Sequence, residues 1–340
     1  MTLEAGARMP RAPASFQPDC TIEGPVIPSS AVSRPRTLGA RLSRRMRIEG
    51  QVWLICIPMI AWVVVFCYLP IWGIATAFIQ YLPGRPILRS PFVGLQYFRE
   101  FFANPEFGMI MRNTLAISGL GILFGFPAPI VLALLINELR PGSFKKTIQT
   151  ISYIPHFVSW VVMASLIFAL LGSEGLVNKL LVSLGILEQP ILWLGEGKYF
   201  WGMLTIVNIW KGIGWSSIIY LSAIAGIDQE LYQAGAVDGL NRAGMVWHIT
   251  LPGIRTTILL LFILGIGGLL YAGFEQQLLL GTPQTRGYYE VIETYAYRYG
   301  IQLGRYAFGT AIEFMMSIIG LALVLSLNAV FKRTMQISII

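Results

Sequence analysis

The chain has 340 residues, of which 55% are hydrophobic and only 12% are charged, and its mean hydropathy is +0.65. A soluble globular domain carries about 25% charged residues, so this composition excludes an ordinary cytosolic enzyme, a disordered protein and a secreted disulfide scaffold. The net charge of +8 is assigned to the cytoplasmic side of a membrane protein rather than to nucleic-acid binding. The sequence therefore predicts an integral membrane protein.

The chain begins with a basic segment, residues 1–47. Its arginines cluster at Arg34, Arg36, Arg41, Arg44, Arg45 and Arg47. The first part of the segment is rich in Pro, Ser and Ala, which predicts a disordered cytoplasmic tail. The apolar run that follows starts too far into the chain and is too long for a signal peptide. Residues 48–340 are expected to form one transmembrane domain.

Six long apolar runs follow in chain order. They cover residues 52–80, 113–137, 148–172, 199–227, 256–280 and 307–331. About 20 apolar residues cross a bilayer as a helix, so the fold class expected is all-α with six transmembrane helices. Pro127, Pro129 and Pro155 are expected to kink or end their helices, and the GxxxG pair Gly121 and Gly125 predicts close helix packing. Lys and Arg are more frequent in the tail, the second and fourth loops and the C-terminus, which predicts both termini in the cytoplasm.

Polar and aromatic residues inside the fourth and fifth runs are candidates for a substrate pathway. A charged side chain in the middle of a bilayer is costly and usually faces protein or water, and sugars bind to aromatic faces together with polar groups. The candidate residues are Asn208, Lys211, Trp215, Tyr271, Glu275 and Gln276. Other interpretations stay open. The charged residues can pair with other helices or extend to the interface, and the tryptophan can belong to an interfacial belt.

The fourth loop, residues 228–255, differs from the others and is expected on the cytoplasmic side. Apolar residues recur at helical spacing from Leu231 onward. Gly239 allows a sharp turn, and Asn241 can cap a second helical stretch. Pro252 is expected to end that stretch before the fifth run. The loop thus predicts a short helix, a turn and a second short helix against the membrane face.

This loop resembles the EAA loop of ABC importer permeases, in which Glu-Ala-Ala, a glycine and Ile-x-Leu-Pro follow at fixed spacing. The corresponding residues here are Gln233, Ala234, Gly235, Gly239, Ile249, Leu251 and Pro252. Gln233 replaces the glutamate and Gly235 replaces the second alanine, but the turn and the hydrophobic docking face are kept. Residues 153–162, 209–228 and 291–301 are similar to one branch of carbohydrate permeases. That branch serves lipoprotein-associated importers and the alginate or pectin oligosaccharide importers.

The resemblance implies a type I ABC importer permease fold. It implies a permease subunit that forms half of the pathway for an oligosaccharide or an acidic polysaccharide such as alginate. The implied partners are an ABC ATPase dimer, a second and different permease chain, a periplasmic or lipid-anchored solute-binding protein and the lipid of a bacterial inner membrane, without nucleic acid. The residues implied to couple the permease to the ATPase are Glu230, Gln233, Ala234, Gly235, Asp238, Gly239, Arg242, Ile249, Leu251 and Pro252.

By analogy with this family, the aromatic outer loops would dock the binding protein. The tyrosines of the loop at residues 281–306 are Tyr288, Tyr289, Tyr295, Tyr297 and Tyr299. The alternative for this loop is an amphipathic segment that lies on the membrane.

The chain lacks a G-x-x-x-x-G-K-[ST] phosphate loop, so ATP and Mg²⁺ are expected on the partner ATPase. Neither a cofactor nor an enzymatic activity is expected in this chain. Cys56 and Cys67 stand too far apart on one helix for a disulfide, and no metal site is expected. Two other functions would leave different signatures in the sequence. An ion-driven secondary transporter should show inverted repeats, and a membrane enzyme of polysaccharide metabolism should gather reactive groups at one depth, whereas the charges here are scattered and His156 is assigned a structural role.

Overall fold

The computed structural model describes residues 38–335. Most of the tail assigned to residues 1–47 therefore lies outside the described residues, whereas residues 38–47 belong to a helix. The chain divides into two units after Cys67. The first contains helix α1 (Leu38–Val63), which leads into the π-helical turn η2 (Val64–Tyr68). The tryptophans Trp53 and Trp62 of α1 are 57% and 58% exposed, like most of the apolar side chains beside them.

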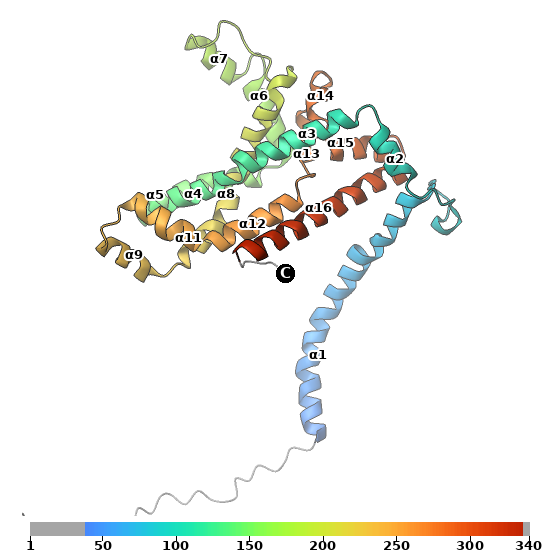
Figure 1. The fold of residues 1–340 in the computed structure, drawn as a ribbon, viewed down its shortest axis with the longest axis horizontal. Coiled ribbons are helices and arrows are strands. Elements are labelled where there is room, and N and C mark those ends of the chain that lie inside the picture. The colour runs from blue at the N-terminus through green and yellow to red at the C-terminus, as the bar shows by residue number, and fades with distance from the viewer. Residues whose placement is uncertain (1–37, 336–340) are drawn as a thin grey trace, which may run out of the picture. The chain divides into compact units, whose positions relative to one another are not determined.

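The second unit is built from helices and helical turns (Figure 1). Its longer helices are α2 (Gln96–Ala103), α3 (Phe107–Leu120), α4 (Pro127–Glu138), α5 (Ser143–Phe157), α6 (Trp160–Leu171), α7 (Leu176–Ser183), α8 (Gly197–Ala225), α9 (Gln229–Val237), α12 (Arg255–Gly267) and α16 (Tyr306–Met335). Its shorter elements are η3 (Leu69–Phe78), η4 (Ile87–Arg89), η5 (Gly121–Gly125), α10 (Arg242–Met245), η6 (Val246–Thr250), α11 (Leu251–Gly253), α13 (Glu275–Leu280), η7 (Pro283–Thr285), α14 (Arg286–Tyr289), α15 (Ile292–Tyr297) and η8 (Arg298–Gln302). Within residues 38–335, β pairing is limited to an isolated bridge between Ile79 and Phe92. The all-α class is therefore confirmed for this part of the chain.

Four stretches of the described chain are long and apolar enough to cross a membrane. They are Val52–Phe78, Phe107–Glu138, Trp160–Ser183 and Tyr306–Arg333. A fifth is counted if Arg242–Gly253 and Arg255–Gly267, which meet at a bend of 60°, form one span. Helix α8 has 29 residues but carries two lysines and is not among these stretches. The expectation of six transmembrane helices is thus not confirmed, since four or five are found among residues 38–335.

The third apolar run, residues 148–172, is divided between α5 and α6. Helix α5 ends two residues after Pro155, whose ring nitrogen cannot donate a hydrogen bond. The Ser159 hydroxyl then accepts a hydrogen bond from the Val162 N–H at 3.3 Å and caps α6. The prediction that Pro155 ends its helix is confirmed, and the prediction of one continuous helix over this run is wrong.

The fifth apolar run, residues 256–280, is also interrupted. Helix α12 ends at Gly267, residues 268–274 lie outside any helix, and α13 begins at Glu275. Gly267 packs closely on α16, because a Cβ there would lie 2.5 Å from Val324 Cγ2. Non-helical backbone at membrane depth is stable where protein buries it or where it lines a cavity. The prediction of one helix over this run is therefore wrong.

Pro127 and Pro129 do not end the helix that contains them. They lie at the start of α4, which continues α3 through the π-helical turn η5. Proline at the first helical turn costs little, because the N–H groups there lack partners within the helix. Pro252 lies inside α11, which ends at the next residue, Gly253, where the chain bends by 60° before α12. The prediction that Pro252 ends this stretch before the fifth run is therefore confirmed.

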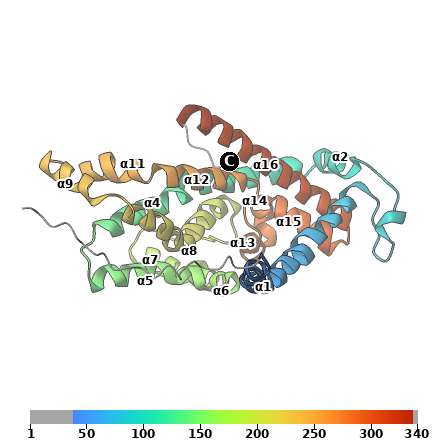
Figure 2. The same cartoon turned by 90° about the horizontal axis from the view of Figure 1, so that it is seen from below.

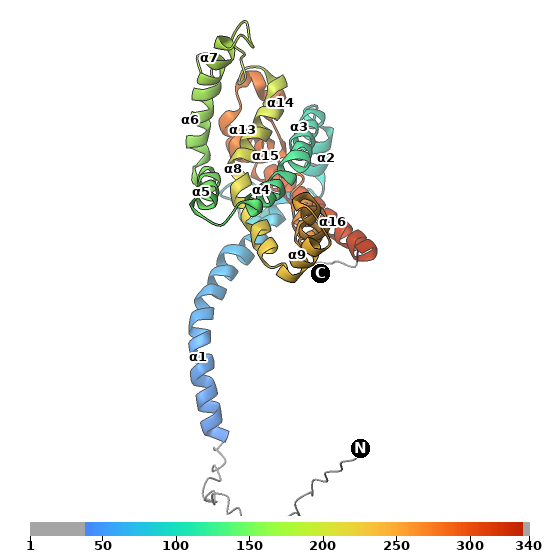
Figure 3. The ribbon, with the colours of Figure 1, turned by 90° about the vertical axis from the view of Figure 1, so that its left-hand side faces the viewer.

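The second unit has two distinct ends. Helices α9 and α11 lie at one end, called here the loop end, and α14 and α15 lie toward the opposite side, called the far end (Figures 1 and 2). Between them α12 runs beside α16, while α6 and α7 rise along one side (Figure 3). The apolar core at the loop end is formed by Ala133, Tyr220, Ile224, Ile227 and Ile254. The core at the far end includes Phe101, Ile110, Ile292, Tyr295 and Phe308.

Candidate functional site

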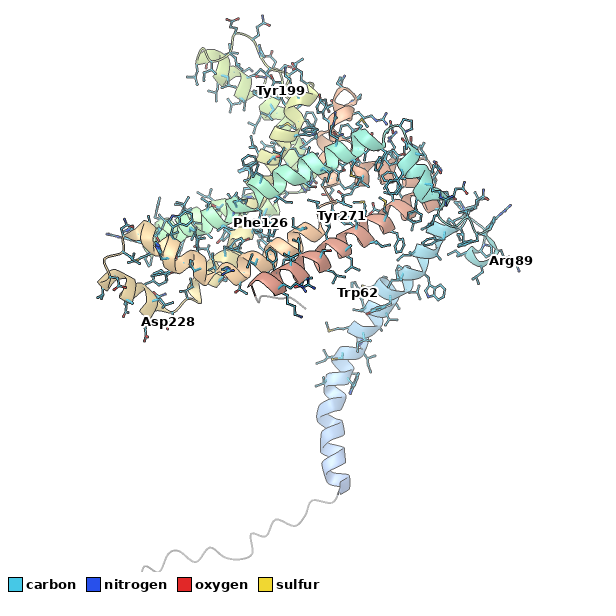
Figure 4. All side chains as sticks on the ribbon, in the orientation of Figure 1. Trp62, Arg89, Phe126, Tyr199, Asp228 and Tyr271 are labelled. Carbon is cyan, nitrogen blue, oxygen red and sulfur yellow. The ribbon has the colours of Figure 1, made fainter. Side chains whose placement is uncertain are left out.

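Helix α9 presents an exposed outer face at the loop end. Asp228, labelled in Figure 4, caps the helix because its carboxylate accepts a hydrogen bond from the Glu230 N–H at 2.9 Å. Four of its exposed residues follow the spacing i, i+3, i+4, i+7 that defines one helix face. They are Glu230, Gln233, Ala234 and Val237, and Gln229, Leu231 and Ala236 of the same helix are also exposed. Val237 is apolar and 88% exposed, so a predicted coupling set and an uncovered apolar side chain share one surface.

The inner face of α9 is fixed to the helix bundle. The hydroxyl groups of Tyr232 and Thr250 lie 2.9 Å apart and share a hydrogen bond. Gly235 is buried, and a Cβ there would lie 2.8 Å from Cδ1 of Ile249. Tyr232 and Ile249 pack against the core at the loop end. That core also contains Ala133 of α4 and Tyr220 of α8, so α9 is packed against the ends of these two helices.

Gly239 forms the turn after α9. Its φ is +78°, in the left-handed region that favours glycine. The Asn241 side-chain oxygen accepts a hydrogen bond from the Gly244 N–H at 2.7 Å and caps α10. The predicted sequence of helix, turn and capped helix is therefore confirmed. The remaining residues of the predicted set are Asp238, Arg242 and Pro252, which are exposed, and Leu251, which is half-buried.

A cavity of about 380 Å³ lies between α3, α8, α12 and the non-helical segment at residues 268–274. Asn208, Tyr271 and Gln276 line it from three different elements. Figure 4 places Phe126 and Tyr271, two of its wall residues, in the middle of the second unit. A second cavity of about 160 Å³ shares Asn208 as a wall residue. Half of the predicted pathway residues therefore converge on one place.

Two further residues of this cavity were not predicted. The Ser118 hydroxyl is buried in the cavity wall and has no hydrogen-bond partner among the described residues. A polar group of this kind is rare, so a ligand hydroxyl or amide would complete it. Gly121 lines both cavities, and a Cβ there would meet no atom within 4 Å. The GxxxG prediction of close packing is wrong at Gly121, which leaves space instead.

Gly273 sets the direction of Gln276. Its φ is +101°, and a Cβ would lie 1.7 Å from the Gln276 Nε2 atom. Its N–H donates a hydrogen bond of 2.7 Å to the Glu293 carboxylate. Burial raises the pKa of Glu293 above its ordinary value. A larger residue at position 273 would displace the Gln276 amide from the cavity.

Lys211 does not line the cavity. Its ammonium group donates hydrogen bonds to the carbonyl oxygens of Pro155 (3.3 Å), His156 (2.9 Å) and Val158 (2.5 Å). It also lies 5.4 Å from the ring centroid of Trp160. These carbonyls end helix α5, where the helix dipole favours a cation. Lys211 therefore caps the end of α5, and its role in a substrate pathway stays a prediction.

Trp215 and Glu275 also lie outside this cavity wall. Trp215 stacks on the His156 ring, with the centroids 4.6 Å apart and the planes at 2°. Glu275 is exposed at the start of α13. The structural role expected for His156 agrees with this stacking. Among the described residues no group of three or more His, Cys, Asp or Glu side chains could hold a metal ion.

A closed ring of four charged residues ties the far end together. Arg286 contacts Glu290 and Glu106, both at 2.6 Å, and Arg298 contacts the same two carboxylates at 2.7 and 2.9 Å. The hydrogen bond that Arg286 donates to the Glu290 carboxylate raises the pKa of Arg286, so the guanidinium stays charged. The ring joins the segment before α3 to α14, α15 and η8.

The tyrosines of the far end pack inward. Tyr295 is fully buried, and its hydroxyl accepts a hydrogen bond from the Asn104 amide at 2.8 Å. Tyr288 and Tyr289 pack against the core beside α6 and α8. These side chains hold the far end together. Tyr295 is therefore not available to a partner, whereas docking of the binding protein on the outer loops stays a prediction.

Comparison with known proteins gives relatives over nearly the whole chain. Protein LplB of Bacillus subtilis (strain 168) is 39% identical and covers 90% of this chain and 97% of its own length. The polygalacturonan/rhamnogalacturonan transport system permease protein YteP of the same organism is 40% identical, and the match covers 86% of this chain and 91% of YteP. Both exceed the similarity needed to assign a common fold and family.

Solved structures agree with these relatives. A chain in the crystal structure of a bacterial ABC transporter that imports the acidic polysaccharide alginate is 37% identical and matches with a TM-score of 0.78 over 87% of this chain and 99% of its own. A second solved structure is that of a bacterial alginate ABC transporter in complex with an alginate pentasaccharide-bound periplasmic protein. One of its chains is 37% identical to this chain and matches with a TM-score of 0.79, over 88% of this chain and 100% of its own. Residues 125–337 match the model of one transport family. On this evidence the chain belongs to the binding-protein-dependent transport system inner membrane components.

Proposed function

We propose that this chain is one of two different permease subunits of an ATP-driven importer, and that its cargo is an oligosaccharide containing uronic acids. The observation that carries the proposal is the match over most of the chain to permeases of two acidic polymers. These are a polygalacturonan/rhamnogalacturonan system and an alginate importer. The family membership makes the chain a transport component, which disfavours a membrane enzyme. The solute-binding protein, the ATPase dimer and the second permease are the partners proposed, with both termini in the cytoplasm.

Coupling to the ATPase is assigned to the outer face of α9 and the turn at Gly239. An exposed apolar side chain beside polar ones is typical of a docking surface, and Val237 beside Glu230 and Gln233 fits that description. The inner face is packed on the bundle, so closure of the ATPases beneath the loop would turn the helices as rigid bodies. ATP and Mg²⁺ belong to the partner in this scheme.

The partners are tested by purifying the tagged chain from native membranes and identifying the co-purifying chains by mass spectrometry. We expect an ATPase and a second permease, and we expect the assembly to take up alginate or polygalacturonate oligosaccharides in proteoliposomes when ATP and the binding protein are present. Neutral maltooligosaccharides serve as the comparison cargo. Isolation of the chain alone in mild detergent would contradict the importer assignment, and equal uptake of neutral and acidic sugars would contradict the cargo assignment only.

The cavity at Asn208 is proposed as part of the sugar pathway. Asn208 lines both cavities. Asn208→Leu is expected to lower uptake by about tenfold, because a sugar hydroxyl would lose the side-chain amide as its hydrogen-bond partner. The matched control is Glu275→Gln, a change at an exposed residue outside the cavity wall, which should transport like the wild type. Normal uptake by Asn208→Leu, with both variants assembling fully, would remove the cavity from the pathway.

A further inference from the structure

An apolar groove of about 590 Å³ runs between α8 and the pair α6 and α7. The α8 wall is a single stripe at helical spacing, formed by Tyr199, Gly202, Met203, Ile206, Val207 and Trp210. From Lys198 to Trp210 this stripe extends about 18 Å at 1.5 Å per residue. The opposite wall is made of Ile167, Leu170, Leu171, Val177 and Leu181. The groove floor is open at Gly202, where a Cβ would meet no atom within 4 Å.

The size and lining of the groove suit a hydrocarbon chain. A sugar would need polar groups along the walls, and the walls between the two ends are aliphatic and aromatic. A flexible chain of methylene groups is narrower than a helix and gains from apolar burial along the whole stripe.

The polar groups at one end of the groove complement a zwitterionic headgroup. Lys198 lines the groove, and its ammonium group lies 2.5 Å from the Glu196 carboxylate. It also lies 4.7 Å from the ring centroid of Tyr199, which packs on Trp193 at 5.2 Å. Tyr and Trp with a lysine are typical of the lipid headgroup region. The hydrogen bond that Lys198 donates to the Glu196 carboxylate raises the pKa of Lys198, so the ammonium group stays charged at neutral pH.

We propose that this groove is a binding site for one phospholipid with an amine-bearing zwitterionic headgroup, such as phosphatidylethanolamine. An acyl chain lies along the α8 stripe, the phosphate contacts Lys198, and the ammonium group contacts Glu196. When the lipid binds, the Lys198–Glu196 contact is replaced by a contact between Lys198 and the phosphate and one between Glu196 and the lipid ammonium group. Neither side chain is then left without an opposite charge. The site differs from the sugar cavity in its walls and in its ligand class.

The experiment is native mass spectrometry of the assembled transporter, purified in mild detergent and given equimolar phosphatidylethanolamine and phosphatidylglycerol. The wild type is expected to retain one phospholipid at this subunit and to prefer phosphatidylethanolamine by about fivefold, the upper range for one exposed ion pair between Glu196 and the lipid ammonium group. Gly202→Phe fills the groove floor and should abolish retention. Gly119→Phe is the matched control, because Gly119 is also exposed on a membrane helix with open space around a Cβ.

A second variant separates lipid binding from folding. Glu196→Gln keeps the apolar groove but removes the charge that contacts the lipid ammonium group, so it should retain lipid with the headgroup preference lost. Equal retention of the two lipids by the wild type, or retention by Gly202→Phe at the wild-type level, would overturn the proposal. So would efficient crosslinking of Ile206→Cys to the second permease, since a protein helix would then cover the groove. If Gly202→Phe fails to assemble, the Glu196→Gln comparison decides.

Discussion

Replacing Gly239 with valine is expected to reduce sugar uptake by about tenfold or more in the assembled transporter. The φ of Gly239 is +78°, and a non-glycine residue in this region costs about 1–3 kcal/mol, most of all when it is β-branched. Each 1.4 kcal/mol corresponds to a factor of ten. A Cβ would meet no atom within 4 Å, so the effect comes from the backbone conformation and not from a clash. Uptake driven by ATP in proteoliposomes measures it.

The matched variant is Gly239→Asn. Asparagine adopts the left-handed conformation more readily than other non-glycine residues, so this variant should keep most of the uptake and the co-purifying ATPase. A valine variant that transports normally, or an asparagine variant that fails as completely as valine, would contradict a conformational role for this turn.

Replacing Lys211 with methionine is expected to lower the unfolding temperature of the transporter by about 5–10 °C. The lysine donates hydrogen bonds to three carbonyl oxygens at the end of α5. Hydrogen bonds to charged groups contribute about 1.5–3 kcal/mol each, and a carbonyl without a partner at membrane depth is costly. A loss of about 3 kcal/mol gives a shift of this size for a domain of 150–250 residues. Thermal unfolding in the same detergent, followed by tryptophan fluorescence, measures it.

The control is Lys146→Met, which removes an exposed lysine from the first turn of the same helix and should leave the unfolding temperature nearly unchanged. Lys211→Arg should recover part of the stability, because arginine also donates several hydrogen bonds. If Lys211→Met instead kept the wild-type unfolding temperature and lost only the uptake of acidic sugars, Lys211 would be a carboxylate-binding residue and the capping role would be wrong.

The loop at residues 228–255 was well predicted because its determinants are local. Helical spacing from Leu231, a glycine at the turn and the asparagine cap at Asn241 each act within a few residues, and the structure contains all three. Once Gly235 is known to be buried, the helical spacing also predicts which residues of α9 lie on its outer face. Which face docks on a partner is a property of the assembly and stays a prediction.

The breaks within the apolar runs were harder to predict from hydropathy. Average hydropathy measures whether a segment is apolar, not whether its backbone stays helical. The segment at residues 268–274 lines the cavity and lies outside any helix. Its backbone finds hydrogen-bond partners elsewhere in the fold, as where the Gly273 N–H donates to the Glu293 carboxylate. Gly273 lies in the non-helical segment and Glu293 lies in α15, 20 residues further along the chain. Tertiary contacts of this kind leave no periodic signal in the sequence.

Lys211 and Ser118 illustrate the same limit at the site. A lysine in an apolar run signals only that a partner exists, and backbone carbonyls are partners that no side-chain pattern reveals. Ser118 is one of many small residues in a membrane helix, and only the cavity beside its hydroxyl distinguishes it. Three predicted residues, Asn208, Tyr271 and Gln276, line the cavity, and their role in the sugar pathway stays a prediction.

The cap formed by Lys211 also bears on the order in which the chain enters the bilayer during synthesis. Helix α8 is not among the stretches apolar enough to cross unaided, yet the acceptor Val158 O precedes its lysine by 53 residues. At roughly 5–20 residues per second, the ribosome delivers that carbonyl about 3–10 seconds before the lysine emerges. The partner of the costly charge is therefore already available when α8 has to be inserted.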